Sequence, residues 1–312
     1  MVPWLLPSGA GALGWWRIRG TSLAATPAGA DLHQAYRWHT LSAARHQLAI
    51  ADVITRLRER GIEPLLIKGW AAARLYAEPG LRPFGDIDLC VPASTSAAAA
   101  ALVSQPGGPI VDLHHDELGA IEGGLAALQA TSLRVTLGAI EARIPGPEQH
   151  LRLTCLHLLK HGAWRPLWLC DVGAALDRRP ANFDWDLLLG RDRTRAGWIA
   201  TTLRLAEALL GASLEGAPAR IRKQRLPRWL LPAVLDRWRL PSPGDHAHEV
   251  FRRAWSNPRR WPAAFRARWP DPITTTLQMR ARFDELPRLP LQLASYAMTC
   301  VLHLVRLARG QA

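Results

Sequence analysis

Two stretches decide the fold of this 312-residue chain: Leu66–Gly69, which reads LIKG, and Arg82–Val91, which reads RPFGDIDLCV. The first ends an apolar run at a glycine, and the second alternates acidic with apolar residues. Because successive side chains of a strand point to opposite faces, Asp86 and Asp88 are expected to project together while the apolar residues face the core. Two neighbouring carboxylates repel each other unless a cation lies between them. Mg²⁺ with substrate phosphates is the usual such cation.

Two aspartates alone would also fit a solvent-exposed strand end, so the surrounding residues decide between these interpretations. The segment Glu63–Ile67 is typical of a buried strand, and Gly69 can adopt backbone angles that let amide groups approach a ligand. Trp70–Ala77 is expected to form a helix whose first amides could hold phosphate. A third acid, Asp112, lies on the next apolar run, Pro109–His114. The pattern therefore predicts three acids on neighbouring strands beside a phosphate-binding turn.

Further segments extend this pattern along the chain, roughly from residue 40 to residue 210. They are Gly61–Gly69, Leu75-Tyr76, Pro79-Gly80, Arg82-Pro83, Gly85–Val91, Val111–His114, Pro147–His150, His157–His161 and Trp168–Val172. Together these segments resemble the uncharacterised nucleotidyltransferases of the DNA polymerase β superfamily. The resemblance implies an α+β fold, with a small mixed sheet flanked by helices and followed by a helical domain.

The resemblance also implies a reaction, in which a nucleoside monophosphate passes from a nucleoside triphosphate, with ATP expected, to a hydroxyl of an unidentified acceptor. Asp86 and Asp88 are expected to bind two Mg²⁺ ions. Asp112 would complete the second metal site and receive the acceptor's proton. The acceptor is left open between a small molecule, a peptide, a protein and an RNA.

The expected nucleotide-binding residues come from two regions of the chain. Lys68, the amides after Gly69 and Arg82 are expected to stabilise charge on the phosphates as pyrophosphate leaves. Lys160 and His161 of the following helix could touch the phosphates or the acceptor. Asp171 could then orient His161, or the two could form a buried hydrogen bond that holds helices together.

Two departures from the wider superfamily bear on activity. Trp70 follows the turn glycine, where many relatives carry Ser or Gly, and its indole could narrow the site or pack behind the helix. The segment between Asp88 and Asp112 also looks shorter than in relatives. A non-catalytic nucleotide-binding or regulatory protein on the same fold is therefore the first alternative.

Composition raises a second alternative, a nucleic-acid-binding module. The formal net charge is +13 and the sequence pI about 10.9, which suits a polyanionic partner but also fits a compositional bias towards Ala, Arg, Pro and Gly. Arginine next to tryptophan can stack on bases, although such tryptophans more often anchor short helices in a core. The pairs are Arg228-Trp229, Arg237-Trp238, Arg260-Trp261 and Arg268-Trp269.

Four scattered cysteines and the chain ends bear on location. The cysteines lack zinc-like spacing and read as buried thiols of a reducing compartment. Met1–Leu6 lacks the basic region of a signal peptide, and the apolar run Leu289–Leu307 is interrupted by His303 and Arg306. We expect a cytoplasmic protein with no transmembrane segment.

The order of elements predicts four regions. Residues 1–30, rich in Gly, Ala and Pro, are expected to be an irregular lead-in. Residues 31–146 would form the nucleotidyltransferase domain, with a long first helix and a hairpin at 133–144. Residues 147–215 would form a helical domain that begins at Pro147, a residue that suits a first helical turn. Residues 216–312 would be an Arg/Trp/Pro-rich helical region.

Overall fold

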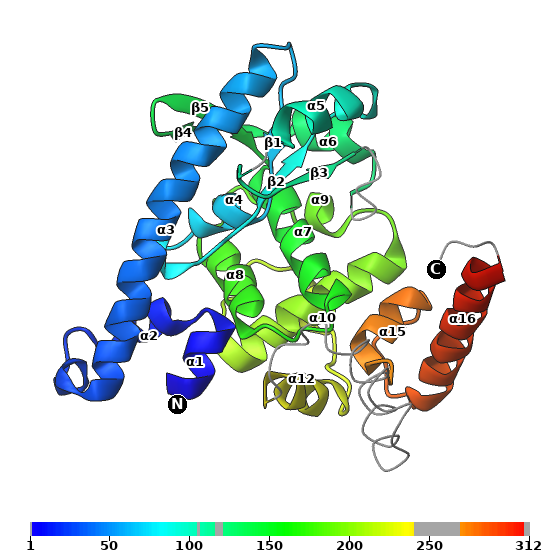
Figure 1. Ribbon diagram of the computed structural model, residues 1–312. Helices are drawn as coiled ribbons and strands as arrows, with labels where there is room; N and C mark the ends of the chain where they lie inside the picture. The colour runs from blue at the N-terminus through cyan, green and yellow to red at the C-terminus, as the bar shows by residue number, and fades with distance from the viewer. Residues whose placement is uncertain (1, 105–106, 116–120, 240–268, 309–312) are drawn as a thin grey trace.

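The computed structural model describes residues 2–104, 107–115, 121–239 and 269–308. A mixed five-stranded sheet lies at one end of the molecule, and a larger group of helices fills the other end (Figure 1). The chain therefore has the mixed α+β class that the sequence predicts.

The N-terminal residues are mainly helical, so the expectation of an irregular lead-in over residues 1–30 is wrong. Helices α1 (Val2–Ser8) and α2 (Gly11–Ile18) are followed by a 3₁₀ turn, η1 (Ser22–Ala25), and by the long helix α3 (Pro27–Arg58). Packing explains the difference, because α1 and α2 lie against α3 and the Trp15 ring stacks on His33 at 4.2 Å between centroids. Tertiary contacts thus override the weak local preference of these residues.

The strand order of the sheet is β3-β2-β1-β5-β4. The strands are β1 (Leu65–Leu66), β2 (Ile87–Cys90), β3 (Val111–His114), β4 (Leu133–Leu137) and β5 (Ile140–Ile144). The pairs β2/β3 and β1/β5 are parallel, whereas β1/β2 and β4/β5 are antiparallel. The β4/β5 pair is the predicted hairpin.

Helices cover both faces of this sheet. On one face, Leu66, Ile87 and Leu89 share a core with Ile50 of α3 and Ala99 of α5 (Ser96–Val103), which follows the short 3₁₀ turn η3 (Ala93–Thr95). On the other face, a second core joins residues of β1 and β2 to α6 (Gly124–Ala130) and α7 (Pro147–Lys160). Strand alternation places Asp88 on this second face, towards α7.

The remaining helices continue from α7, where Pro147 occupies the first turn as predicted. They are α8 (Pro166–Asp177), α9 (Trp185–Leu189), α10 (Arg193–Leu210), α11 (Ala219–Arg222), α12 (Leu230–Arg239), α15 (Pro272–Gln278) and α16 (Leu289–Ala308). One hydrophobic core contains residues from Leu151 to Phe283, so the later helices pack on the earlier ones. Among the helices of the described ranges, none is both long and apolar enough to cross a membrane.

The tryptophans of two Arg-Trp pairs pack against this core. The Trp229 indole donates to the Asp284 carbonyl at 2.8 Å, and the Trp238 indole donates to the Ala163 carbonyl at 2.8 Å. These two tryptophans act as helix anchors. Arg260-Trp261 and Arg268 lie outside the described residues.

Candidate active site

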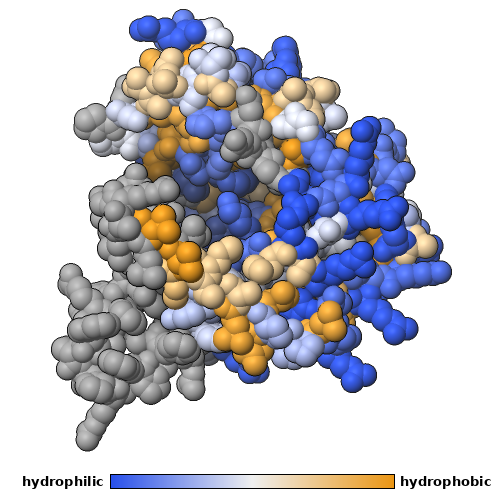
Figure 2. Space-filling model, turned by 90° about the vertical axis from the view of Figure 1, so that its right-hand side faces the viewer, coloured by the Kyte–Doolittle hydropathy of each residue, from blue (hydrophilic) through white to orange (hydrophobic). Residues whose placement is uncertain are grey.

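A cavity of about 780 Å³ lies between the sheet and the helices, and all eight predicted site residues line it. They are Lys68, Gly69, Arg82, Asp86, Asp88, Asp112, Lys160 and His161. A hollow among hydrophilic residues is visible on the face of the molecule shown in Figure 2. The fold therefore brings together residues that are up to 93 positions apart in the sequence, from Lys68 to His161.

The register of β2 and β3 places the second and third acids side by side. In this parallel pair Asp88 lies opposite Asp112. Asp88 is buried, at 5% exposure, whereas the Asp112 side chain is 57% exposed. The segment between Asp88 and Asp112, which looks shorter than in relatives, is therefore long enough for β2 and β3 to pair.

His114 completes a close group with these two acids. Its Nε2 lies 3.0 Å from Asp88 Oδ1 and 3.2 Å from Asp112 Oδ2. One ligand atom from each of the three residues lies within 4.8 Å of the others. Strand alternation in the sequence already places His114 on the face of Asp112. Metal ligation by His114, however, is not part of the sequence prediction.

Asp86 lines the same cavity but stands outside this group of three. It precedes β2, whose first residue, Ile87, is paired with Val111. Asp86 is exposed. Strand alternation thus predicts its general direction but not its separation from Asp88.

Lys68 supplies the cation that the crowded acids require. Its Nζ lies 2.8 Å from Asp88 Oδ1 and 3.2 Å from His114 Nε2. Burial raises the pKa of Asp88, but the His114 hydrogen bond and the Lys68 charge outweigh it, so this pKa lies below its ordinary value. Lys68 also has a φ of 49°, a backbone angle that is costly for a residue with a Cβ.

The turn glycine lies beside the start of β2. A Cβ on Gly69 would make ordinary contacts, 3.4 Å from the Asp86 carbonyl oxygen and 3.9 Å from Asp88 Oδ2. The following helix, α4, spans only Gly69–Ala73 and is shorter than predicted. Trp70 is 5% exposed and packs into the core between the sheet and α3, so its indole lies behind the helix and does not line the cavity.

Arg82 is held by a buried acid on α8. Its guanidinium donates to Asp171 from Nη2 at 2.8 Å and from Nε at 3.1 Å, and Tyr76 donates to the same carboxylate at 2.8 Å. Burial lowers the pKa of Arg82, but the Asp171 charge outweighs it and the pKa is raised. The predicted contact between Asp171 and His161 is wrong, because Arg82 and Tyr76 occupy that carboxylate.

The end of α7 places an aromatic cluster on the cavity wall. The ring of His157 lies 4.5 Å from His161 and 4.6 Å from Trp168 between centroids. Burial, followed by the charge of His161, lowers the pKa of His157 to about 3. Burial also lowers the pKa of His161, and the nearby ammonium of Lys160 lowers it further. Both pKa values thus lie below the ordinary histidine value, which favours the neutral imidazole, a ring that can donate one hydrogen bond and accept another.

Three arginines of the cavity wall are missing from the sequence prediction: Arg165, Arg195 and Arg280. Arg165 is half-buried and donates from Nε to the Ser8 carbonyl at 3.0 Å. Burial lowers its pKa, and the charge of Arg82 lowers it further. Within the described ranges it forms no ion pair. In a chain with 39 basic residues, no local signal separates these three from surface arginines.

Among solved structures, the chain is similar to an antigenic nucleotidyltransferase-like protein from Paracoccidioides brasiliensis, with 14% identity and a TM-score of 0.40. That alignment covers 56% of this chain and 91% of the other. No curated protein matches the chain. Residues 12–107, which include Lys68, Asp86 and Asp88, match the family of uncharacterised nucleotidyltransferases, which confirms the family that the sequence motifs indicate.

Proposed function

We propose that the protein is a nucleotidyltransferase that moves a nucleoside monophosphate from a nucleoside triphosphate to a hydroxyl of an acceptor. The observation that carries this proposal is that Asp88, Asp112 and Lys68 meet in one cavity, which is also lined by several other cationic side chains. In this transfer the acceptor oxygen forms a bond to the α-phosphorus, and the bond from that phosphorus to pyrophosphate breaks.

The residues present suit a divalent cation. Two carboxylates and an imidazole lie close enough to share one ion, and carboxylate oxygens are the ligands that Mg²⁺ prefers. Asp88 and Asp112 would hold the metal, with Asp86 from the same cavity available for a second ion. When bound, the metal would neutralise phosphate charge and lower the pKa of the acceptor hydroxyl. Imidazole is a ligand more typical of transition metals than of Mg²⁺, so a transition-metal ion that also accepts carboxylates, Mn²⁺, belongs in the same test.

The cations of the wall would bind the phosphates. Lys68 lies beside Asp88, and its ammonium would be available to a phosphate oxygen if Asp88 held a metal ion. Arg82 is oriented by Asp171, and Arg165 brings a half-buried charge that an anion would neutralise. Lys160 and His161 line the same cavity. Positive charge placed in advance stabilises the charge that develops on the leaving pyrophosphate.

Asp112 is the residue proposed to take the acceptor's proton. Its side chain is 57% exposed, so it can pass the proton to water after transfer. His114 lies 3.2 Å from it and fixes one carboxylate oxygen. Asp88 is buried and ion-paired, which suits it to binding a cation rather than to proton exchange.

Calorimetric titration of ATP and GTP, with and without Mg²⁺ or Mn²⁺, tests this proposal on the wild type and on Asp88→Asn. We expect metal-dependent binding that weakens at least about tenfold in the variant, because a charged ligand group is worth about 1.5–3 kcal/mol. Asp236→Asn is the matched control, since the Asp236 side chain is 68% exposed and pairs only with Arg239 on α12 in the described structure. Binding that ignores the metal and Asp88 would refute the site.

Nucleotide binding without transfer is the second candidate. It is favoured by the Lys68 ammonium, which lies 2.8 Å from Asp88 and competes with a cation for that oxygen. Release of pyrophosphate in the presence of candidate acceptors separates the two functions. Binding without release across small-molecule, peptide and RNA acceptors would favour the non-catalytic function.

A further inference from the structure

The helices contribute a part of the cavity wall that carries two arginines, and the proposed reaction assigns no role to either of them. Arg195 lies in the first turn of α10, and Arg280 follows α15. Trp198 and Leu277 line the cavity with them, so the wall offers both charge and apolar surface. Both arginines lie outside residues 12–107, the part of the chain that matches the nucleotidyltransferase family.

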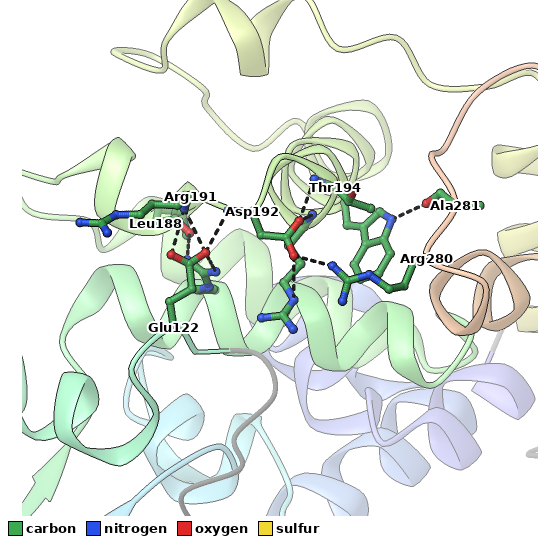
Figure 3. A network of polar contacts seen from close by, with 10 residues as sticks. Glu122, Leu188, Arg191, Asp192, Thr194, Arg280 and Ala281 are labelled. Atoms are coloured by element: carbon green, nitrogen blue, oxygen red, sulfur yellow. Dashed lines mark hydrogen bonds and ion pairs between the residues drawn. The ribbon is translucent and has the colours of Figure 1, made fainter.

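A single acid, Asp192, holds both side chains. Its Oδ2 lies 2.7 Å from Arg280 Nη2 and 3.6 Å from Arg195 Nε. Its Oδ1 accepts from the backbone amides of Thr194 at 2.9 Å and Arg195 at 3.1 Å, which fixes the carboxylate at the start of α10 (Figure 3). Two guanidinium groups therefore share one carboxylate, and among the described residues no second acid pairs with either of them.

The loop that carries Asp192 is itself anchored. Glu122 accepts hydrogen bonds from the backbone amides of Arg191 and Asp192, each at 3.0 Å. The same carboxylate lies 3.2 Å from the guanidinium of Arg152, a side chain that is only 2% exposed (Figure 3). Asp192 thus rests on a buried support rather than on a free surface loop.

Arg280 is held in a conformation that local preference alone would not select. Its φ is 47°, a left-handed value that is unfavourable for a residue with a Cβ. The next residue is fixed, because the Trp198 indole donates to the Ala281 carbonyl at 2.8 Å (Figure 3). This turn directs Arg280 to Asp192 while 63% of its side chain stays exposed for a ligand.

From this geometry we infer that Arg195 and Arg280 form a subsite for an anionic group of the acceptor, a phosphate or a carboxylate. The inference rests on the proposed function, in which Asp88 and Lys68 serve the donor nucleotide and Asp112 takes the proton of the acceptor hydroxyl. Guanidinium groups recognise these anions through paired, charge-assisted hydrogen bonds. Trp198 and Leu277 would contact the apolar body of the same molecule. The acceptor hydroxyl would then belong to an acidic small molecule or to a phosphorylated chain end.

Binding of two simple probes tests the subsite without the unknown acceptor. Glycerol 3-phosphate and 3-hydroxypropanoate carry a phosphate and a carboxylate, and glycerol is the neutral control. Each is titrated, by chemical-shift changes in indole NMR signals, into protein saturated with a non-hydrolysable ATP analogue and Mg²⁺, and into nucleotide-free protein. We expect one or both anions to bind, and affinity to fall at least about fivefold in Arg195→Gln and in Arg280→Gln.

Arg193→Gln is the matched control, because Arg193 lies on the same helix, is exposed and does not line the cavity. Equal losses in Arg193→Gln would show a general charge effect and overturn the subsite. So would unchanged probe binding in both cavity variants, or no anion binding to the wild type. A parallel loss of ATP-analogue affinity would assign the arginines to the donor instead. Asp88→Asn separates the two proposals, because it should lose nucleotide binding but keep anion binding in nucleotide-free protein. Nucleotide binding that is unchanged in Asp88→Asn would therefore count against the proposed function and not against the subsite.

Discussion

At the scale of single residues, the site depends on how each buried charge is compensated. Asp88 has Lys68 and His114 as partners, whereas Arg82 has Asp171. In the described structure Arg165 is half-buried and has a backbone carbonyl as its hydrogen-bond partner but no ion pair. A partly buried charge without a counter-ion is costly, so we expect Arg165 to gain most from an anionic ligand.

Removing the partner of Arg82 should destabilise the protein strongly. In Asp171→Asn the Arg82 guanidinium, 8% exposed, would keep its charge and lose its counter-ion. We expect the free energy of unfolding in urea to fall by about 3 kcal/mol. Asp186→Asn removes the acid of the Arg220 pair, whose Asp186 side chain is 88% exposed, and should cost less than about 1 kcal/mol. Similar losses in the two variants would contradict this account of the Arg82–Asp171 pair.

At the scale of elements, strand register and turn packing place these residues. The register of β2 on β3 sets Asp88 beside Asp112, and strand alternation brings His114 to the same face. The short 3₁₀ turn η2 (Pro79–Leu81) lies on α3 directly before Arg82. Strand alternation can be predicted from the sequence. The close contact of η2 with α3 cannot, because it depends on residues some forty positions apart.

Gly80 is the residue that permits this contact. A Cβ at this position would lie 2.1 Å from Thr40 Oγ1 and 2.8 Å from Thr40 Cα, so α3 or the turn would have to move. We expect Gly80→Ala to lower the free energy of unfolding by about 1–3 kcal/mol. Gly85→Ala is the control in the same loop, since a Cβ there meets no atom within 4 Å. Thermal or urea unfolding measures both, and equal stability of the two variants would contradict the packing of η2.

At the scale of the whole molecule, sheet and helices meet through buried polar residues as well as apolar ones. His150 of α7 is 6% exposed, and burial lowers its pKa to about 4. Its Nε2 has no hydrogen-bond partner in the described structure. The folded protein therefore holds this histidine neutral at pH values where the unfolded chain would protonate it.

This difference predicts acid destabilisation. Between about pH 6.5 and pH 4 the unfolded chain binds a proton at His150 that the folded protein does not, so stability falls as the pH is lowered. Above about pH 6.5 neither state binds this proton and the loss of stability vanishes. Within the window the free energy of unfolding changes by up to about 1.4 kcal/mol per pH unit. Urea unfolding of wild type and His150→Gln at pH 7, 6 and 5 measures it. The stability advantage of the wild type should shrink with falling pH, and a constant difference would refute the assignment.

Local sequence patterns predicted the strands that carry Asp88 and Asp112, the β4/β5 hairpin, the start of α7 at Pro147 and the family of residues 12–107. These features depend on alternation, on proline and glycine geometry and on a local motif, all of which act over a few neighbouring residues. The position of Lys160 and His161 near the acids is different, because it was expected only from the family resemblance and not from a local pattern.

Tertiary structure alone decided the other features of the site. It folded residues 2–18 into two helices on α3, paired Arg82 with Asp171, set Trp70 behind the site and brought His114 within hydrogen-bond distance of both acids. It also brought Arg165, Arg195 and Arg280 to one cavity wall. The physical reason is that ion pairing and burial depend on distances between segments remote in the sequence, and an arginine's local sequence is the same whether it faces solvent or a cavity.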